Sequence, residues 1–229
     1  MKVYETKEIK NIALLGSKGS GKTTLAEAML YECGVIKRRG TVEAKTTTCD
    51  YFPVEKEYGY SVFSTVFYAE FLNKKLNVID CPGSDDFVGN AVTALNVTDT
   101  GVILIDGQYG VEVGTQNIFR TCEQLKKPII FAINQLDGEK ADFDNSLLQL
   151  KEHYGSKVVP IQFPINCGPS FNSMIDVLLM KQYSWGPEGG VPTITEIPEE
   201  YKEKALEMHQ QLVEAAAEND EGLMDKFFE

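Results

Sequence analysis

A glycine-rich stretch near the start of the sequence has the residue types and spacing of a phosphate-binding loop. It reads G-x-x-x-x-G-K-T and comprises Gly16, Ser17, Lys18, Gly19, Ser20, Gly21, Lys22 and Thr23. Glycines let the backbone curl so that successive N–H groups point inward, and a phosphate chain can sit in that concavity at the start of a helix. In such a loop Lys22 reaches the outer phosphates and the Thr23 hydroxyl binds Mg²⁺. A flexible Gly/Ser turn is the alternative, but the order of strand, loop, lysine, hydroxyl and helix favours the phosphate loop.

A second candidate site is Asp80-Cys81-Pro82-Gly83, at the end of an apolar, strand-like run. Asp80 suits a ligand to metal-bound water, and the backbone N–H of Gly83 suits a contact with a terminal phosphate. D-x-P-G by itself is a common turn. Its place after a phosphate loop, on a different strand, favours the metal and phosphate interpretation.

A third candidate site is Asn134-Gln135-Leu136-Asp137, which also follows a strand-like run. The Asp137 carboxylate can accept two hydrogen bonds from the N1–H and N2–H₂ edge of guanine, which adenine lacks, while the Asn134 amide holds the other edge of the base. N-x-x-D by itself usually marks a turn. After the two preceding motifs, it favours guanine recognition.

Alternating strands and helices can place these three motifs at one edge of a sheet. Apolar or β-rich runs predict strands at residues 10–15, 60–71, 76–80, 101–106 and 128–134, and intervening patterns predict helices at 24–32, 86–95, 116–125 and 144–154. Residues 60–71 and 76–80 form an antiparallel hairpin. The motifs stand at carboxyl ends of strands, so we expect an α/β fold, a P-loop NTPase doubly wound, mostly parallel sheet with an antiparallel edge hairpin.

Residues 36–59 show no clear periodicity and include the basic cluster Lys37, Arg38 and Arg39. A loop of this length inside a compact domain is usually functional or disordered. Next to a phosphate site, we favour a nucleotide-sensing switch over plain disorder.

The character of the sequence changes after residue 156. We expect strands at 158–165, 174–180 and 191–197, with a turn-rich break at 186–190. A long acidic helix over 198–229 then carries an apolar face made of Leu206, Leu212, Val213, Ala216, Leu223 and Phe227. The expected organisation is a core at 1–156 and a smaller α+β subdomain at 157–229.

Composition limits the partners of the chain. It has 229 residues and a formal net charge of −12, which argues against broad nucleic-acid binding by this segment. No apolar run approaches a membrane span, and Met1 to Glu5 do not begin a signal peptide. Five scattered cysteines fit a reducing, cytoplasmic location without a disulfide framework or zinc site.

Together the three motifs resemble those of translational GTPases, specifically the elongation factor G-like group. The resemblance extends over nearly the whole chain, through residues 38–43, 80–83, 86–89, 110–115, 175–176, 180–181, 185, 212–214, 217–224 and 226. The second-half matches correspond to the subdomain inserted into the nucleotide domain of elongation factor G. The family closes its guanine pocket with a later Ser-Ala-type loop that this sequence lacks, so we expect a leading fragment of a larger protein.

The resemblance implies binding of GTP or GDP with Mg²⁺. The implied nucleotide contacts are Gly16, Ser17, Lys18, Gly19, Ser20, Gly21, Lys22, Thr23, Thr24, Asn134, Gln135 and Asp137. The implied metal ligands are Thr23, Ser61 and, through water, Asp80. The implied catalytic positions are Lys22, Asp80, Gly83 and Ser84.

Several of these positions depart from the family pattern. Ser84 stands where the family has a histidine that positions the attacking water, so we expect slow hydrolysis. Gln135 replaces a lysine whose stem covers the base, which predicts weakened nucleotide affinity. Gly19 replaces an aspartate, Tyr58 an arginine, and Ser61 a threonine whose hydroxyl it keeps.

The resemblance therefore favours a monomeric guanine-nucleotide switch domain that works on the ribosome. The alternative is a non-catalytic ribosome-binding module with a vestigial nucleotide pocket. A P-loop kinase would need an acceptor site and a lid, which the sequence does not show.

Overall fold

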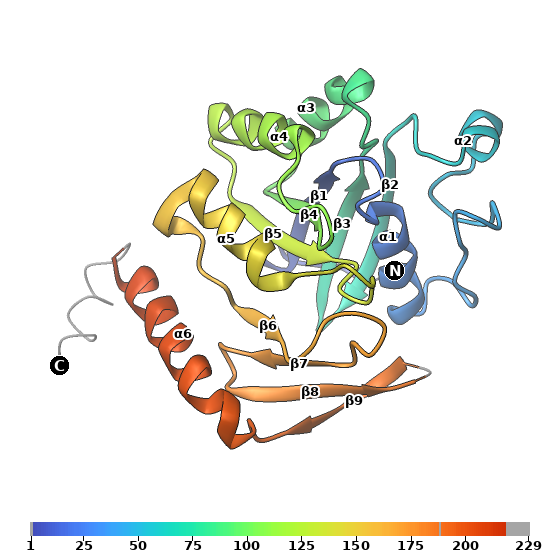
Figure 1. The fold of residues 1–229 in the computed structure, drawn as a ribbon. Coiled ribbons are helices and arrows are strands. Elements are labelled where there is room, and N and C mark those ends of the chain that lie inside the picture. The colour runs from blue at the N-terminus through green and yellow to red at the C-terminus, as the bar shows by residue number, and fades with distance from the viewer. Residues whose placement is uncertain (1, 188, 219–229) are drawn as a thin grey trace. The chain divides into compact units, whose positions relative to one another are not determined.

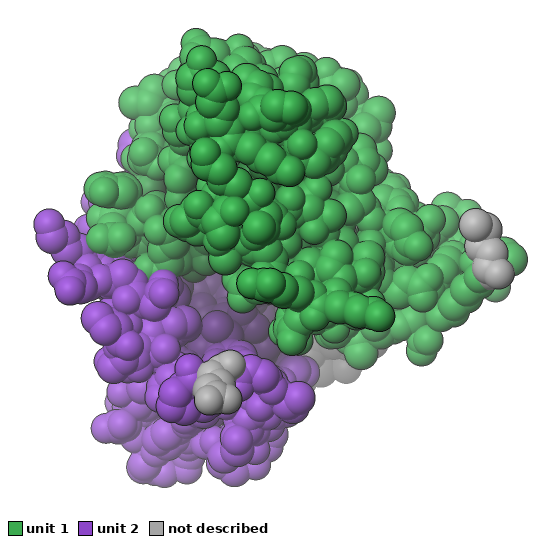
Figure 2. Space-filling model, turned by 90° about the vertical axis from the view of Figure 1, so that its right-hand side faces the viewer, with its two compact units in different colours: residues 1–135 green, residues 136–229 purple. Residues whose placement is uncertain are grey.

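The computed structural model describes residues 2–187 and 189–218. The chain forms two compact units, residues 1–135 and 136–229, which Figure 2 colours separately.

The first unit is built on a five-stranded sheet in the order β2-β3-β1-β4-β5 (Figure 1). Four strands are parallel: β1 (Ile9–Gly16), β3 (Lys74–Asp80), β4 (Thr100–Asp106) and β5 (Ile129–Asn134). The edge strand β2 (Thr65–Phe71) runs antiparallel to β3. The structure thus confirms the predicted doubly wound, mostly parallel sheet with an antiparallel edge hairpin.

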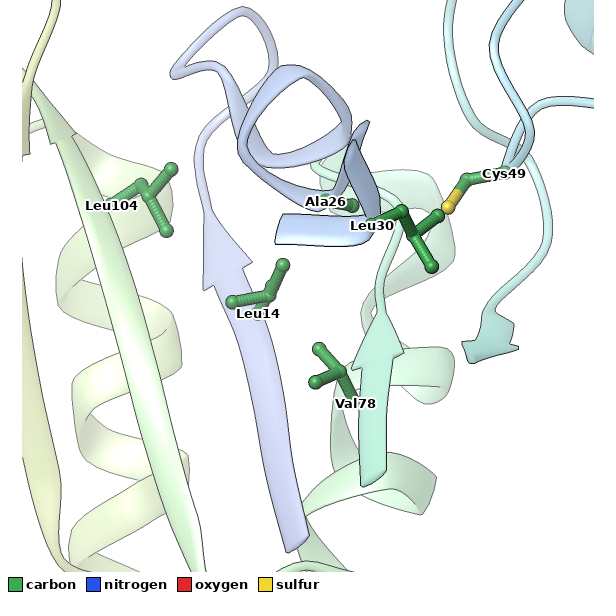
Figure 3. Close-up of a cluster of buried hydrophobic side chains, with 6 residues drawn as sticks. All are labelled: Leu14, Ala26, Leu30, Cys49, Val78 and Leu104. Atoms are coloured by element: carbon green, nitrogen blue, oxygen red, sulfur yellow. The ribbon is translucent and has the colours of Figure 1, made fainter. Parts of the chain in front are cut away.

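Successive side chains of β1 point to opposite faces of the sheet, and Ala13, Leu14 and Leu15 are all buried. Both faces are therefore apolar, and helices pack against each of them. On one face, Leu14 packs with Ala26 and Leu30 of α1 (Lys22–Glu32) in the cluster that Figure 3 shows. On the other face, Gly101 leaves room for Leu15, for Leu95 of α3 (Val88–Val97) and for Cys122 of α4 (Val113–Gln124). These three helices were all predicted from the sequence, within a few residues at their ends.

The segment between α1 and β2 is folded and contains the short helix α2 (Pro53–Tyr58), which the sequence did not predict. Pro53 fixes the backbone for a first helical turn, and Gly59 ends the helix with φ 68°. The buried Glu55 carboxylate accepts hydrogen bonds from the N–H groups of Val62 and Phe63, each at 3.0 Å. These bonds hold residues 60–64 outside the sheet, so β2 begins at Thr65 and not at the predicted residue 60.

The second unit contains a four-stranded sheet in the order β6-β7-β8-β9. Its strands are antiparallel: β6 (Gln162–Pro164), β7 (Ser173–Asp176), β8 (Lys181–Gly186) and β9 (Gly189–Thr195). The helices of this unit are α5 (Phe143–Tyr154) and α6 (Glu199–Ala217). The first unit also contains the 3₁₀ turns η1 (Thr6–Glu8) and η2 (Asp85–Phe87), and the second unit contains η3 (Gly155–Lys157).

The strands of the second unit differ from the prediction in two places. The predicted strand at 174–180 ends at Asp176, whose carboxylate accepts the Leu179 N–H at 2.7 Å and closes a turn. β8 was missed because Lys181, Gln182 and Ser184 are polar, and the alternating pair Tyr183 and Trp185 is too short a pattern to predict a strand. β8 and β9 pair as a hairpin, and the expected turn-rich break at 186–190 falls where the chain passes from β8 to β9.

The apolar face predicted for the last helix is wrong at Leu206, Val213 and Ala216, which are exposed, whereas Leu212 is half-buried and Leu223 and Phe227 lie outside the described residues. Leu206 is 59% exposed and Val213 39% exposed, whereas Ala205 is buried. The packed face instead carries Lys204, whose ammonium lies 4.9 Å from the Phe163 ring centroid, and His209. His209 Nδ1 lies 2.8 Å from the carbonyl oxygen of Val177, in the turn that follows β7. The predicted continuation over 219–229 lies outside the described residues.

The division between the units falls between Gln135 and Leu136, earlier than residues 156 and 157, where the sequence suggested it. Residues soon after this point bond to later parts of the chain: the Gly168 N–H donates to the Leu136 carbonyl at 2.7 Å, and Lys204 pairs with Asp144 at 3.2 Å. Helix α5 therefore belongs with the second unit. Within the described residues, no helix has the length and apolar character needed to span a membrane.

Candidate functional site

The glycine-rich loop joins β1 to α1 and has backbone angles that favour glycine. Gly16, Gly19 and Gly21 have φ values of 134°, 87° and 92°. A Cβ at Gly16 would also lie 2.4 Å from the carbonyl oxygen of Leu104. The loop can therefore take this path only with small residues at these points, and it delivers Lys22 and Thr23 to the first turn of α1.

The Lys22 side chain lies inside this loop. It is only 6% exposed, and its ammonium donates hydrogen bonds to the carbonyl oxygens of Gly16 at 2.9 Å and Ser17 at 2.8 Å. Burial lowers the pKa of Lys22, while the nearby Asp80 charge opposes that shift. Gly83 comes so close that an added Cβ would lie 2.4 Å from the Lys22 ammonium. Lys22 and Gly83, predicted from separate motifs, are thus neighbours.

Three oxygen-bearing side chains from different segments meet beside Lys22. Thr23 Oγ1 donates to Asp80 Oδ2 at 2.8 Å and lies 3.1 Å from Ser61 Oγ. Asp80 is 2% exposed, and its Oδ1 has no hydrogen-bond partner among the described residues. A buried carboxylate oxygen without a partner is costly. Burial accordingly raises the pKa of Asp80 to about 7, although the Thr23 hydrogen bond and the Lys22 charge oppose the rise.

This donor set fits Mg²⁺, which prefers oxygen ligands and keeps several of its waters beside phosphates. Thr23 and Ser61 offer hydroxyl oxygens, and the free Asp80 oxygen can accept a hydrogen bond from metal-bound water. The described residues contain no cluster of three His, Cys, Asp or Glu side chains of the kind that holds a metal without a substrate. Mg²⁺ sites that use one or two protein ligands together with phosphate oxygens are common, and the Thr23, Ser61 and Asp80 oxygens suit an ion of that kind.

Asp50 is a site residue to which the sequence assigned no role. Its carboxylate accepts a hydrogen bond from Ser61 Oγ at 2.7 Å, and the side chain is 5% exposed. Burial raises its pKa. The sequence offers no periodic pattern around Asp50, so its position could be found only from the fold of the segment.

A cavity of about 600 Å³ lies next to the loop, on the side of Gly83. Its lining comes from the glycine-rich loop, from the turn after β3 and from the start of α4, and comprises Ser17, Lys18, Gly83, Ser84, Asp85, Val111, Glu112, Val113, Gly114 and Gln116. Ser84 Oγ donates to Asp86 Oδ2 at 3.4 Å. The hydroxyls of Ser17 and Ser20 are buried without a partner among the described residues, so they are free to bond a ligand.

The amides at the end of β5 fasten the same loop from the other side. Asn134 Nδ2 donates to the Ser20 carbonyl at 2.9 Å, and Gln135 Nε2 donates to the Gly19 carbonyl at 2.6 Å. Asn134 also explains the glycine at position 21, where a Cβ would lie 2.4 Å from Nδ2. Asp137 opens the second unit, and its side chain is exposed.

The sequence also matches known families. The family described as the elongation factor Tu GTP binding domain matches residues 7–225. The chain belongs to this family. It is 33% identical over 221 residues to an elongation factor G-like protein from Thermotoga maritima. The matched residues make up 96% of this chain and 31% of the relative.

A solved structure has a similar fold. A crystal structure of a Thermus thermophilus protein superposes with a TM-score of 0.90 at 35% identity, over 96% of this chain and 33% of the other. The chain thus spans about a third of the length of these relatives. The elongation factor G-like resemblance is confirmed, and the chain is a GTP-binding domain of that group.

Proposed function

We propose that this GTP-binding domain is the GTP/GDP switch of an elongation factor G-like factor that acts on the ribosome, and that it hydrolyses GTP slowly. The observation that carries the proposal is the meeting of Thr23, Ser61 and Asp80 beside Lys22, with one Asp80 oxygen left without a partner among the described residues. We assign residues 157–229 to the inserted subdomain of that factor and expect a cytoplasmic monomer.

Nucleotide binding would use the backbone amides of residues 19–24 for the phosphates. Lys22 would exchange its two carbonyl partners for phosphate oxygens, and the Gly83 N–H would contact the terminal phosphate. Thr23 and Ser61 would ligate Mg²⁺, with Asp80 acting through water. When bound, the ion neutralises charge on the phosphate oxygens during transfer.

Guanine would be read by Asn134 and Asp137. Asp137 is exposed and therefore accessible to the base edge. Gln135 bonds to the loop through its amide and lacks the long aliphatic stem of lysine, which supports the expectation of weaker nucleotide affinity. Gly19, in place of the family's aspartate, removes a candidate ligand for a monovalent cation.

Slow hydrolysis follows from the side chain at position 84. The serine hydroxyl bonds to Asp86 nearby and lacks the reach and basicity of an imidazole. Loss of such a group costs on the order of 10²–10⁴-fold in rate. Binding of GTP would then persist longer than in a factor with the histidine.

The alternative is a non-catalytic ribosome-binding module with a vestigial pocket. Ser84 and Gln135 favour it, whereas the assembled Lys22, Thr23 and Asp80 oppose it. Calorimetry of the full-length protein with Mg²⁺ and either GDP or a non-hydrolysable GTP analogue separates the two. We expect saturable binding of both nucleotides and much lower affinity in Lys22→Ala. A titration that shows no heat of binding for either nucleotide would support the vestigial pocket.

A further inference from the structure

The glycine-rich loop contains a second lysine, Lys18, whose side chain does not point back into the loop. Its ammonium lies 3.7 Å from the centroid of the Tyr60 ring. A cation so close to a ring face is attracted by the ring quadrupole. Tyr60 directly precedes Ser61, which contacts Thr23 and Asp50. Lys18 therefore connects the phosphate loop to the segment between α1 and β2.

Lys18 also lines the cavity beside Gly83 and Ser84. A Cβ at Gly83 would lie 2.8 Å from the Lys18 backbone nitrogen and 2.4 Å from the Lys22 ammonium. Both lysines thus border the point at which Gly83 approaches the loop. This is the side of the loop on which the proposed function places the terminal phosphate.

The charge of Lys18 has no acidic partner in the described part of the chain. Ion pairs there involve Lys7, Lys181, Lys202 and Lys204, but not Lys18. A cation–π contact at an exposed site is weak, whereas a hydrogen bond from an ammonium to a phosphate is charge-assisted. A phosphate that enters the cavity can therefore draw Lys18 away from the Tyr60 ring.

We propose that the Lys18 side chain is a second phosphate-binding cation, which rests on Tyr60 without GTP and binds the terminal phosphate when GTP is present. This inference depends on the proposed function, because it requires a guanine nucleotide in the loop. GDP lacks the γ-phosphate, which is the terminal phosphate of GTP, so Lys18 stays on Tyr60 when GDP is bound. Lys18 thereby sets the preference for GTP over GDP and releases Tyr60 from its contact only in the GTP state.

The test compares affinities for Mg²⁺–GDP and a non-hydrolysable Mg²⁺–GTP analogue, measured by calorimetry on the full-length protein. Lys18→Met keeps the length of the side chain and removes its charge. We expect the affinity for the analogue to fall about tenfold, the usual effect of one hydrogen bond to a charged group, and the affinity for GDP to stay unchanged. Lys18→Arg should restore the preference for the analogue.

Two further variants sharpen the result. Tyr60→Leu removes the ring that Lys18 contacts, so Lys18 no longer has to break a cation–π contact to reach the phosphate. Binding of the analogue should become about two- to fivefold tighter while GDP binding stays the same. Lys75→Met is the matched control, because the Lys75 ammonium also lies over an aromatic ring, 5.1 Å from the Tyr68 centroid, on the edge hairpin. It should change neither affinity.

Three outcomes would overturn the inference. Equal weakening of both nucleotides in Lys18→Met would show that Lys18 only supports the loop. No change in that variant would show a solvated lysine without a role in binding. If the unaltered protein binds neither nucleotide, the proposed function fails as well, and this outcome is visible before any variant is made.

Discussion

A substitution at Ser84 tests the proposed reason for slow hydrolysis. Its side chain borders a cavity of about 600 Å³, which leaves space for a larger group near Gly83. We expect Ser84→His to raise ribosome-stimulated GTP hydrolysis by the full-length protein on the order of 10²-fold, because an imidazole can position and deprotonate water. Single-turnover release of phosphate measures this rate.

Ser84→Ala is the control for this substitution. It removes a hydroxyl that bonds only weakly to Asp86, at 3.4 Å, and should leave both hydrolysis and nucleotide affinity as they are. If Ser84→His binds nucleotide normally but is no faster, the missing histidine is not the reason for slow turnover.

Asp137 determines the base preference in the proposed guanine site. Asp137→Asn replaces an acceptor by a donor where guanine presents N2–H₂, whereas xanthine presents a carbonyl oxygen there. We expect the affinity for GDP to fall and that for XDP to rise, so that the preference between them reverses. Competition binding with both nucleotides measures the ratio, and unchanged guanine selectivity would remove Asp137 from the site.

At the scale of elements, the segment between α1 and β2 is held by buried carboxylates. Glu27 of α1 is 0% exposed and accepts hydrogen bonds from the backbone N–H groups of Gly40, at 3.0 Å, and Thr48. Hydrogen bonds to charged groups contribute about 1.5–3 kcal/mol each. Glu27 therefore ties the helix that carries Lys22 and Thr23 to the segment that carries Asp50 and Ser61.

We expect Glu27→Ala to loosen this segment and to lower the free energy of unfolding by about 1.5–3 kcal/mol per lost bond. Trypsin should then cut faster after the exposed Lys37, Arg38 and Arg39. Urea denaturation and timed proteolysis measure the two effects. Glu32→Ala, an exposed position on the same helix, should change neither; equal cutting of both variants would contradict the role given to Glu27.

The elements that the sequence predicted well are those with local signals. Apolar runs identified β1, β3, β4 and β5, and the motifs at their ends predicted Lys22, Thr23, Asp80 and Asn134 as site residues, which lie in or beside the glycine-rich loop. The sequence could not predict contacts that depend on distant segments, such as Ser61 with Asp50 or Lys18 with Tyr60. Helix α2 was missed because the buried side chain that holds it in place is the Glu55 carboxylate and not an apolar residue. Strand β8 was missed because most of its residues lack the apolar side chains that mark a strand.

At the scale of the whole molecule, charge limits what the chain can bind. Its 34 acidic and 22 basic residues leave a formal net charge of −12. Non-specific nucleic-acid binding depends on the release of counterions by basic side chains, and typical dissociation constants are about 10⁻⁴–10⁻⁶ M at physiological salt. Contact of this chain with RNA must therefore be local, and Lys37, Arg38 and Arg39 are an exposed basic cluster that could provide it.

We expect the chain to bind a generic single-stranded or duplex RNA more weakly than about 10⁻⁴ M at physiological salt, because net repulsion opposes the approach of the phosphate backbone. Fluorescence anisotropy over a series of salt concentrations measures both affinity and the number of released ions. Micromolar binding that survives replacement of Lys37, Arg38 and Arg39 by glutamate would contradict the expectation. Micromolar binding that this replacement abolishes would also contradict the expectation, and it would place the RNA contact at the basic cluster of Lys37, Arg38 and Arg39.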